Sequence, residues 1–158
     1  MRDLMTVGVE TCTPETPIAD IARVMLLNQV DAVVVLEEGN ALGVIGQKEL
    51  VRAYSREDYD SLVAENVMRE GVPQVPPDIP LAAAAQIMLD MDVRTLFLMH
   101  QSAGIEYPAA LISFRHLLRH MAAEKSDELR DLGIKAERKS PLETFIQRRN
   151  AARNKLSS

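Results

Sequence analysis

The chain has 158 residues, of which 47% are hydrophobic, 26% charged and 4% aromatic, and its net charge is −5. This composition excludes a disordered chain and a fibrous protein and fits a soluble globular one. A single cysteine, Cys12, excludes an internal disulfide framework. The most apolar window, 18–36, holds three charged residues, and the first six residues have no apolar stretch of secretory length. We therefore expect a cytoplasmic protein without a membrane span.

The sequence contains an internal repeat. A shift of 63 positions aligns residues 4–36 with 67–99 and gives ten identities, where about two would arise by chance. The identical pairs are Met5/Met68, Gly8/Gly71, Val9/Val72, Pro14/Pro77, Pro17/Pro80, Ala19/Ala82, Ala22/Ala85, Met25/Met88, Leu26/Leu89 and Val30/Val93. Beyond this block the shift becomes 67, so the second copy carries four extra residues, within 100–108. An insertion between two apolar runs is expected at a hairpin turn.

Both copies predict the same order of elements, beginning with a short extended segment that ends near Pro14 or Pro77. Pro17 and Pro80 then open a helix in its first turn, where the missing N–H is tolerated, and Thr16 caps the first of these helices. Two short apolar runs follow in each copy and predict a hairpin. The runs are Val33–Leu36 with Leu42–Ile45, and Leu96–Met99 with Ala109–Ile112.

A second helix begins at Gln47 in the first copy and at Phe114 in the second. Each unit is therefore strand, helix, strand, strand, helix, and the two units pack their apolar faces on each other. The predicted fold class is α/β, with the first repeat in residues 1–63 and the second in residues 64–133.

Residues 134–158 form a separate extension with a net charge of +5, beside a body of −10. The last helix of the second copy continues to Leu132, with Gly133 as its cap. Ser140–Glu143 then opens an extra C-terminal helix with a capping box and a proline in the first turn. This basic helix could pack on the acidic body or a second subunit, bind a partner protein, or touch nucleic acid or anionic lipid. Charge complementarity favours the first of these.

The repeat resembles a CBS-domain pair, the Bateman module. The leads Leu4–Thr6 and Val67–Met68 and the Pro-x-x-Pro spacings fit that family. The family pattern at the end of each copy is glycine, two apolar residues, serine or threonine, two variable residues, aspartate and an apolar residue. Here the copies read Gly43–Leu50 and Ala110–Leu117. The resemblance covers about residues 2–121 and implies two repeats packed as a pseudo-twofold pair.

In that family, such pairs bind adenosine-containing ligands such as AMP, ATP or S-adenosylmethionine in clefts between the repeats. The family's aspartate accepts hydrogen bonds from both ribose hydroxyls, and its serine or threonine meets the phosphate end. Here Glu49 replaces the aspartate of the first copy and Gly46 lacks the hydroxyl, whereas the second copy keeps Ser113 but has His116 at the aspartate position. Neutral imidazole accepts one hydrogen bond from a ribose hydroxyl, and imidazolium attracts phosphate. The alternative is that these residues merely open a helix after a strand.

Positive charge near the motifs bears on phosphate binding. Lys48 lies in the first motif, Arg115 lies in the second, and Arg94 aligns with Asp31 at the entry to the second hairpin. These positions favour the second cleft for an anionic ligand. The candidate nucleotide-binding residues are Ser113, His116, Arg115, Arg94, Ala110, Glu49, Gly46, Gln47 and Lys48.

No catalytic constellation is evident in the sequence. His116, His120 and Glu124 share a helix face, but nothing marks a further fixed ligand, so we expect a polar face rather than a metal site. No nucleophile with a base, CxxC pair or phosphate-binding glycine loop is present. The sequence therefore predicts a protein that is not an enzyme.

The resemblance implies a non-catalytic regulatory module that binds an adenosine nucleotide (AMP, ADP or ATP) or S-adenosylmethionine and regulates an unidentified partner. The alternative is a ligand-independent dimerisation or scaffold protein with degenerate nucleotide sites. We expect a flat homodimer with an apolar seam at Met25, Met88 and Met121, and no membrane or nucleic-acid partner.

Overall fold

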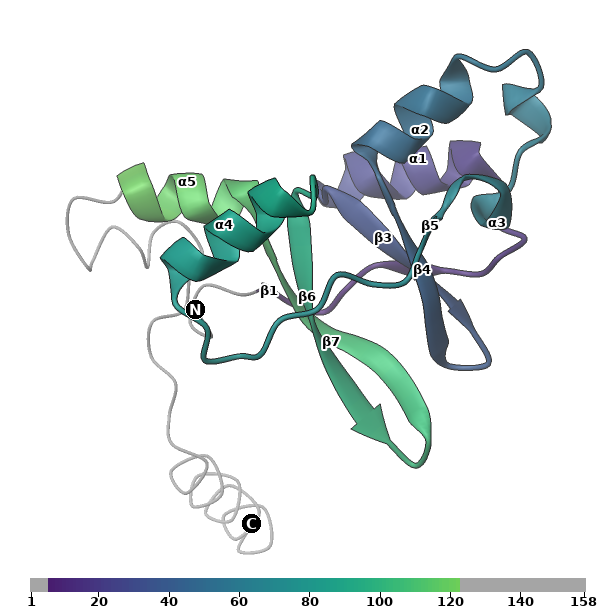
Figure 1. Cartoon of the computed structure of the whole chain (residues 1–158). Helices are drawn as coiled ribbons and strands as arrows, with labels where there is room; N and C mark the ends of the chain where they lie inside the picture. Colours follow the sequence, from purple (N-terminus) through teal and green to yellow (C-terminus); the bar gives the residue numbers. More distant parts are fainter. Residues whose placement is uncertain (1–5, 123–158) are drawn as a thin grey trace, which may run out of the picture. The chain divides into compact units, whose positions relative to one another are not determined.

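The computed structural model describes residues 6–122 of the chain. The first repeat comprises β1 (Thr6–Val7), β2 (Thr11–Cys12), α1 (Ile18–Asn28), β3 (Ala32–Glu37), β4 (Asn40–Gly46) and α2 (Gln47–Tyr54). After a short 3-10 turn, η2 (Tyr59–Ser61), the second comprises α3 (Ala64–Val67), β5 (Arg69–Glu70), α4 (Leu81–Asp90), β6 (Thr95–Ser102), β7 (Ile105–Ser113) and α5 (Phe114–Ala122). The predicted α/β repeats are confirmed (Figure 1). The predicted helix continuation to Leu132 and the basic helix after Ser140 lie outside the described residues.

The two prolines predicted inside the first helical turns instead occupy the N-cap positions. Pro17 has φ −59° and ψ 141°, and Pro80 has φ −61° and ψ 145°, so both are extended and the helices begin one residue later. In the first repeat, Pro17 forms an antiparallel bridge with Val63, which holds it extended. The predicted cap, Thr16, instead accepts a hydrogen bond from the Thr13 N–H through its hydroxyl, at 3.1 Å.

Each repeat contributes its leading strand to the sheet of the other. The two sheets have the strand orders β1-β7-β6 and β2-β3-β4-β5. Thr6 of β1 lies opposite Leu111 of β7, and Arg69 of β5 lies opposite Val44 of β4. Thr6 aligns with Arg69 at the shift of 63, and Val44 aligns with Leu111 at the shift of 67. The two strand pairs are therefore equivalent. The repeats are therefore related by a pseudo-twofold exchange of their leading strands.

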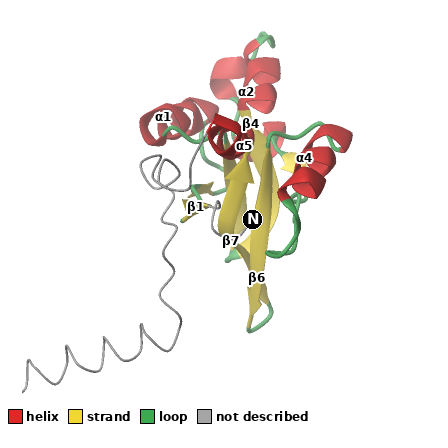
Figure 2. Cartoon of the chain, turned by 90° about the vertical axis from the view of Figure 1, so that its left-hand side faces the viewer, coloured by secondary structure: helices red, strands yellow, loops and turns green. Residues whose placement is uncertain are grey.

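The two hairpins differ only in length. β6 and β7 have 8 and 9 residues, against 6 and 7 in β3 and β4, and this extension accounts for the four extra residues of the second copy. Both turns, Glu38–Gly39 and Ala103–Gly104, have two positive φ angles in succession. This is the type I′ geometry that matches the twist of two-residue hairpins. In Figures 1 and 2 the hairpin tips point away from the helices.

Apolar side chains form a core in each repeat and a further cluster shared by both. The shared cluster consists of Ala32, Val34, Val44, Phe97 and Leu111. Val34 and Val44 come from β3 and β4, whereas Phe97 and Leu111 come from β6 and β7. The apolar surfaces of the two repeats therefore pack on each other, as the sequence predicts.

The predicted apolar seam of three methionines is wrong. Met25 and Met88 are buried in the cores of their own repeats, and only Met121 is exposed, at 78%. Exposed apolar residues instead lie one or two positions away on the same helices, as Leu26, Leu27 and Leu89. The seam was misplaced because one face of a helix at 3.6 residues per turn cannot be assigned to core or surface from periodicity alone.

No helix within residues 6–122 is long and apolar enough to cross a membrane.

Candidate functional site

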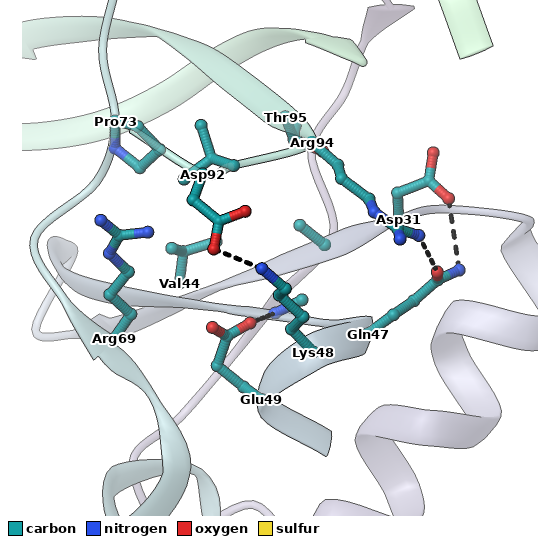
Figure 3. Close-up of a pocket in the computed structure, with 13 residues that line it drawn as sticks. Asp31, Val44, Gln47, Lys48, Glu49, Arg69, Pro73, Asp92, Arg94 and Thr95 are labelled. Atoms are coloured by element: carbon teal, nitrogen blue, oxygen red, sulfur yellow. Dashed lines mark hydrogen bonds and ion pairs between the residues drawn. The ribbon is translucent and has the colours of Figure 1, made fainter. Parts of the chain in front are cut away.

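A pocket opens where the first motif faces the beginning of β6. Its volume is about 50 Å³, and Figure 3 shows the side chains around it. The lining residues come from both repeats: Asp31, Ala32, Val44, Gly46, Gln47, Lys48 and Glu49 from the first, and Arg69, Pro73, Asp92, Val93, Arg94 and Thr95 from the second. The pocket is thus a property of the repeat pair and not of either repeat alone.

Buried residues form the floor of this pocket. Ala32 and Val44 of the first repeat and Pro73 and Thr95 of the second are buried. Among them only Thr95 carries a polar side chain, and its hydroxyl oxygen has no hydrogen-bond partner among the described residues. An unpaired buried polar group costs about 1–3 kcal/mol.

Charged side chains form the rim and link the two repeats. Lys48 of α2 forms an ion pair with Asp92, which follows α4 (Figure 3). The hydrogen bond and charge of Lys48 hold the pKa of Asp92 below its usual value. Arg94 Nη1 donates to Gln47 Oε1 at 3.1 Å, and Arg69 donates to the Met91 carbonyl at 3.1 Å. All these groups are exposed, so each contact contributes little stability.

Glycines in the first motif allow this close arrangement. A Cβ at Gly43 would lie 2.4 Å from the Arg69 carbonyl oxygen, so only glycine lets β5 lie beside β4 and place Arg69 at the rim. The backbone N–H of Gly46 donates to Glu49 Oε2 at 2.9 Å. That carboxylate oxygen therefore accepts from one of the unpaired N–H groups at the start of α2.

The second motif folds in the same way, but two of its polar side chains, Ser113 and His116, pair with each other. The Ser113 N–H donates to His116 Nδ1 at 3.0 Å, and the Ser113 hydroxyl lies 2.9 Å from the same nitrogen. Both residues are buried, and His116 is only 7% exposed. Burial is the main cause that lowers the pKa of His116, with a further lowering by the positive charges of Arg119 and Arg115 that outweighs the opposing effect of Asp31.

His116 is therefore neutral at neutral pH, with Nδ1 as an acceptor, because a backbone N–H can only donate. The lowered pKa disfavours the imidazolium form of His116 at neutral pH, and a contact of this residue with phosphate stays a prediction. His116 is the equivalent of Glu49 in the second repeat. It accepts the backbone hydrogen bond at the start of α5, as Glu49 does at the start of α2. Ser113 and His116 open α5 directly after β7, and their role as nucleotide-binding residues stays a prediction.

The side chains of the predicted arginines make contacts that cross between the repeats. The Arg94 backbone carbonyl accepts from Phe114, but its side chain reaches Gln47 of the first motif. Arg115 lies near Asp31, at 3.8 Å, and donates to the Gln29 carbonyl. The pocket at the first motif thus gathers Lys48, Arg69 and Arg94 beside the carboxylates Asp31, Glu49 and Asp92. The pseudo-twofold exchange causes this, because it places the first strand of one hairpin beside the helix start of the other repeat.

The predicted residues divide between two places. Gly46, Gln47, Lys48, Glu49 and Arg94 line the pocket, whereas Ala110, Ser113, Arg115 and His116 do not. Sequence reasoning missed Arg69, Asp92 and Thr95. The alignment of the repeats could have pointed to Arg69 and Thr95. Arg69 is equivalent to Thr6 and Thr95 to Ala32, and in a symmetric pair equivalent positions lie beside the motif of the opposite repeat.

The described residues contain no group of three side chains able to hold a metal ion. His116 and His120 lie on α5, and Glu124, the third member of the triad considered, lies outside the described part of the chain. Cys12 packs against the first-repeat core, and burial raises the pKa of its thiol despite a hydrogen bond with Thr16. This cysteine therefore remains protonated at neutral pH.

Comparison with known proteins agrees with this architecture. The CBS-domain family matches the chain twice, over residues 1–56 and 63–123. A 17.7 kDa protein of Acidianus ambivalens, described as uncharacterized and encoded in the bps2 3′ region, is 32% identical over 120 residues, which cover 75% of this chain and 71% of that protein.

Solved structures share the fold at low identity. The CBS-domain containing protein ATU1752 from Agrobacterium tumefaciens matches with a TM-score of 0.68 and 20% identity, over 77% of this chain and 98% of that chain. The CBS-domain pair of protein MJ0100, crystallised with 5′-methylthioadenosine and S-adenosyl-L-methionine, matches with a TM-score of 0.65 and 14% identity, over 76% and 97%. With two family matches, a pseudo-twofold exchange of strands and a pocket between the repeats, the chain belongs to the CBS-domain family, as a tandem pair.

Proposed function

We propose that this CBS-domain pair is a regulatory module that binds an adenosine-containing nucleotide at the first motif and regulates a partner protein. The observation that carries the proposal is the pocket between the repeats, with a buried, mainly apolar floor and a rim that holds Lys48, Arg69 and Arg94. Proteins built from CBS-domain pairs are generally regulatory rather than catalytic. The MJ0100 pair with two adenosine-type ligands supports this ligand class.

The two parts of the pocket suit the two ends of a nucleotide. An apolar floor gains free energy by covering a flat base, and the exposed cations attract phosphate against the opposing charge of the lining carboxylates Asp31, Glu49 and Asp92. A volume of about 50 Å³ is below the 300–1,000 Å³ of ordinary ligand pockets, so the rim must part on binding. The rim contacts are exposed and individually weak, so the binding free energy can offset their loss.

We expect at least one of AMP, ADP, ATP and S-adenosylmethionine to raise the melting temperature of the full chain. A ligand at 100 times its dissociation constant adds about 2.7 kcal/mol of stability. For a ligand with phosphates, Arg69→Gln should weaken binding about 10-fold to 150-fold, the effect of one hydrogen bond to a charged group. Thermal shift for the panel, followed by calorimetry for the ligand that binds, measures both effects.

Arg23→Gln is the matched control, because Arg23 is an exposed arginine whose ion-pair partner, Asp20, also lies outside the pocket. It should leave the affinity unchanged. An equal loss in both variants would place the ligand elsewhere in the pair. No shift with any of the four ligands at millimolar concentration would exclude the nucleotide function and favour the alternative, a ligand-independent dimerisation or scaffold protein.

We also propose that the chain forms a homodimer through the exposed apolar residues of its four long helices, the helix-face patch. These are Leu26 and Leu27 on α1, Val51 and Tyr54 on α2, Leu89 on α4, and Leu118 and Met121 on α5. Leu26 aligns with Leu89 and Val51 with Leu118, so both repeats present similar surfaces. Exposed apolar side chains that the internal repeat presents twice suit self-association, because pairing two copies removes them from water.

The double variant Leu26→Asp, Leu89→Asp should be monomeric, because two charges on each helix-face patch would be buried without partners in a dimer. Sedimentation equilibrium at micromolar concentration should show a dimer for the unmodified chain and a monomer for the variant. Ile105→Asp, an exposed apolar position on the second hairpin, serves as the control and should stay dimeric. A monomeric unmodified chain would contradict the proposal.

A further inference from the structure

Thr95 has a hydroxyl that the fold does not explain. The residue is the first of β6, is only 5% exposed, and its Oγ1 has no hydrogen-bond partner in the described part of the chain. Most buried polar side-chain atoms in proteins are hydrogen-bonded, so such an exception calls for a reason. The aligned residue of the first repeat is Ala32, which is equally buried and begins β3. The same strand position therefore folds without a hydroxyl.

The position of Thr95 supplies a reason. Thr95 lines the pocket, and the other buried lining residues, Ala32, Val44 and Pro73, have no polar side-chain atoms. The cations of the pocket lie at the exposed rim, whereas the carboxylates of Asp31 and Glu49 are half-buried. A ligand that enters base first would bring its polar edge to the floor and leave its anionic end among Lys48, Arg69 and Arg94. Thr95 is then the only buried lining side chain that can hydrogen-bond to that edge.

We propose that Thr95 is a specificity-determining residue of this pocket, whose hydroxyl pairs with a hydrogen-bonding edge of the purine base of the ligand. The inference rests on the proposed nucleotide function and names one of its contacts. A hydroxyl both donates and accepts, so it pairs with a ring nitrogen or an exocyclic amine. A ligand with an apolar edge at the floor would leave the hydroxyl unpaired and bind more weakly.

The proposal predicts effects of opposite sign on stability and on affinity. Thr95→Val keeps the shape of the side chain and removes the hydroxyl. Without ligand, this variant should melt higher than the unmodified chain by about 2–12 °C, because an unpaired buried polar group is lost. Its affinity for the nucleotide that shifts the unmodified chain should fall about fivefold to tenfold, because one hydrogen bond is lost. A purely structural threonine would not produce this combination.

Two further variants complete the experiment. Thr95→Ser keeps the hydroxyl and should retain the affinity to within about twofold. Thr16→Val makes the same chemical change at a threonine outside the pocket whose hydroxyl accepts from the Thr13 N–H, so it should lower the melting temperature and leave the affinity unchanged. Melting without ligand and calorimetry with AMP, ADP, ATP and S-adenosylmethionine provide the two readouts.

The outcomes separate this proposal from the function on which it rests. Equal affinity of Thr95→Val and the unmodified chain would overturn the role of Thr95 and leave the nucleotide function standing. A melting temperature of Thr95→Val below that of the unmodified chain would show that the hydroxyl is already paired, and would overturn the proposal as well. If none of the four nucleotides binds the unmodified chain, the proposed function and this contact fail together.

Discussion

Replacing Phe97 with alanine should lower the free energy of unfolding by about 3–5 kcal/mol and destabilise both repeats together. The Phe97 ring is 0% exposed and belongs to the cluster shared by the repeats, against Ala32, Val34 and Val44 of the first repeat. Its removal leaves a cavity that neither sheet can close without moving the other. Because small domains are stable by only about 5–15 kcal/mol, this loss is a large fraction of the total.

Urea denaturation followed by circular dichroism, together with hydrogen exchange of α1 and α4, measures this effect. The Phe97→Ala variant should unfold in a single transition, with faster exchange in both helices. Met88→Ala is the matched control, because Met88 is equally buried but its cluster lies within the second repeat. Met88→Ala should lower the free energy of unfolding by about 2–5 kcal/mol and speed hydrogen exchange first in α4. Unchanged exchange of α1 in Phe97→Ala would show that the repeats are energetically independent.

Acidification from pH 7.5 to 5.5 should destabilise the protein through His116. The folded pKa of this histidine lies below its ordinary value of 6.5. Between the two pKa values the unfolded chain binds more protons than the folded chain, so stability rises with pH in that window and falls as the pH drops through it. Each unit of separation between the two pKa values corresponds to about 1.4 kcal/mol. Protonation also removes the acceptor for the Ser113 N–H at the start of α5.

His116→Gln should remove most of this pH dependence, because glutamine accepts the same backbone hydrogen bond in a capping box with Ser113 and does not titrate. Melting temperatures at pH 7.5, 6.5 and 5.5 compare the two proteins. His120→Gln, an exposed histidine on the same helix, should behave like the unmodified chain. If the unmodified chain and His116→Gln lose equal stability between pH 7.5 and 5.5, the coupling to His116 is refuted.

The sequence by itself determined the elements and their repetition. The ten identities at one shift, the apolar runs around Glu38–Gly39, and the helix starts at Gln47 and Phe114 all reappear in the structure. These features are local, because periodicity, turn residues and prolines act within a few positions of the chain. The CBS-domain resemblance followed from the same local patterns, since each motif is contiguous.

Only the tertiary structure decided which side chains share a cleft. Arg94 is 47 positions from Gln47 and Lys48 is 44 from Asp92, yet each pair is in contact. The exchange of β1 and β5 between the sheets creates these contacts, and strand pairing between distant segments is decided by the burial of whole faces, which no short motif records. The place of Thr95 in a pocket lined by both repeats has the same origin. It is a property of the pair that neither repeat carries in its own residues.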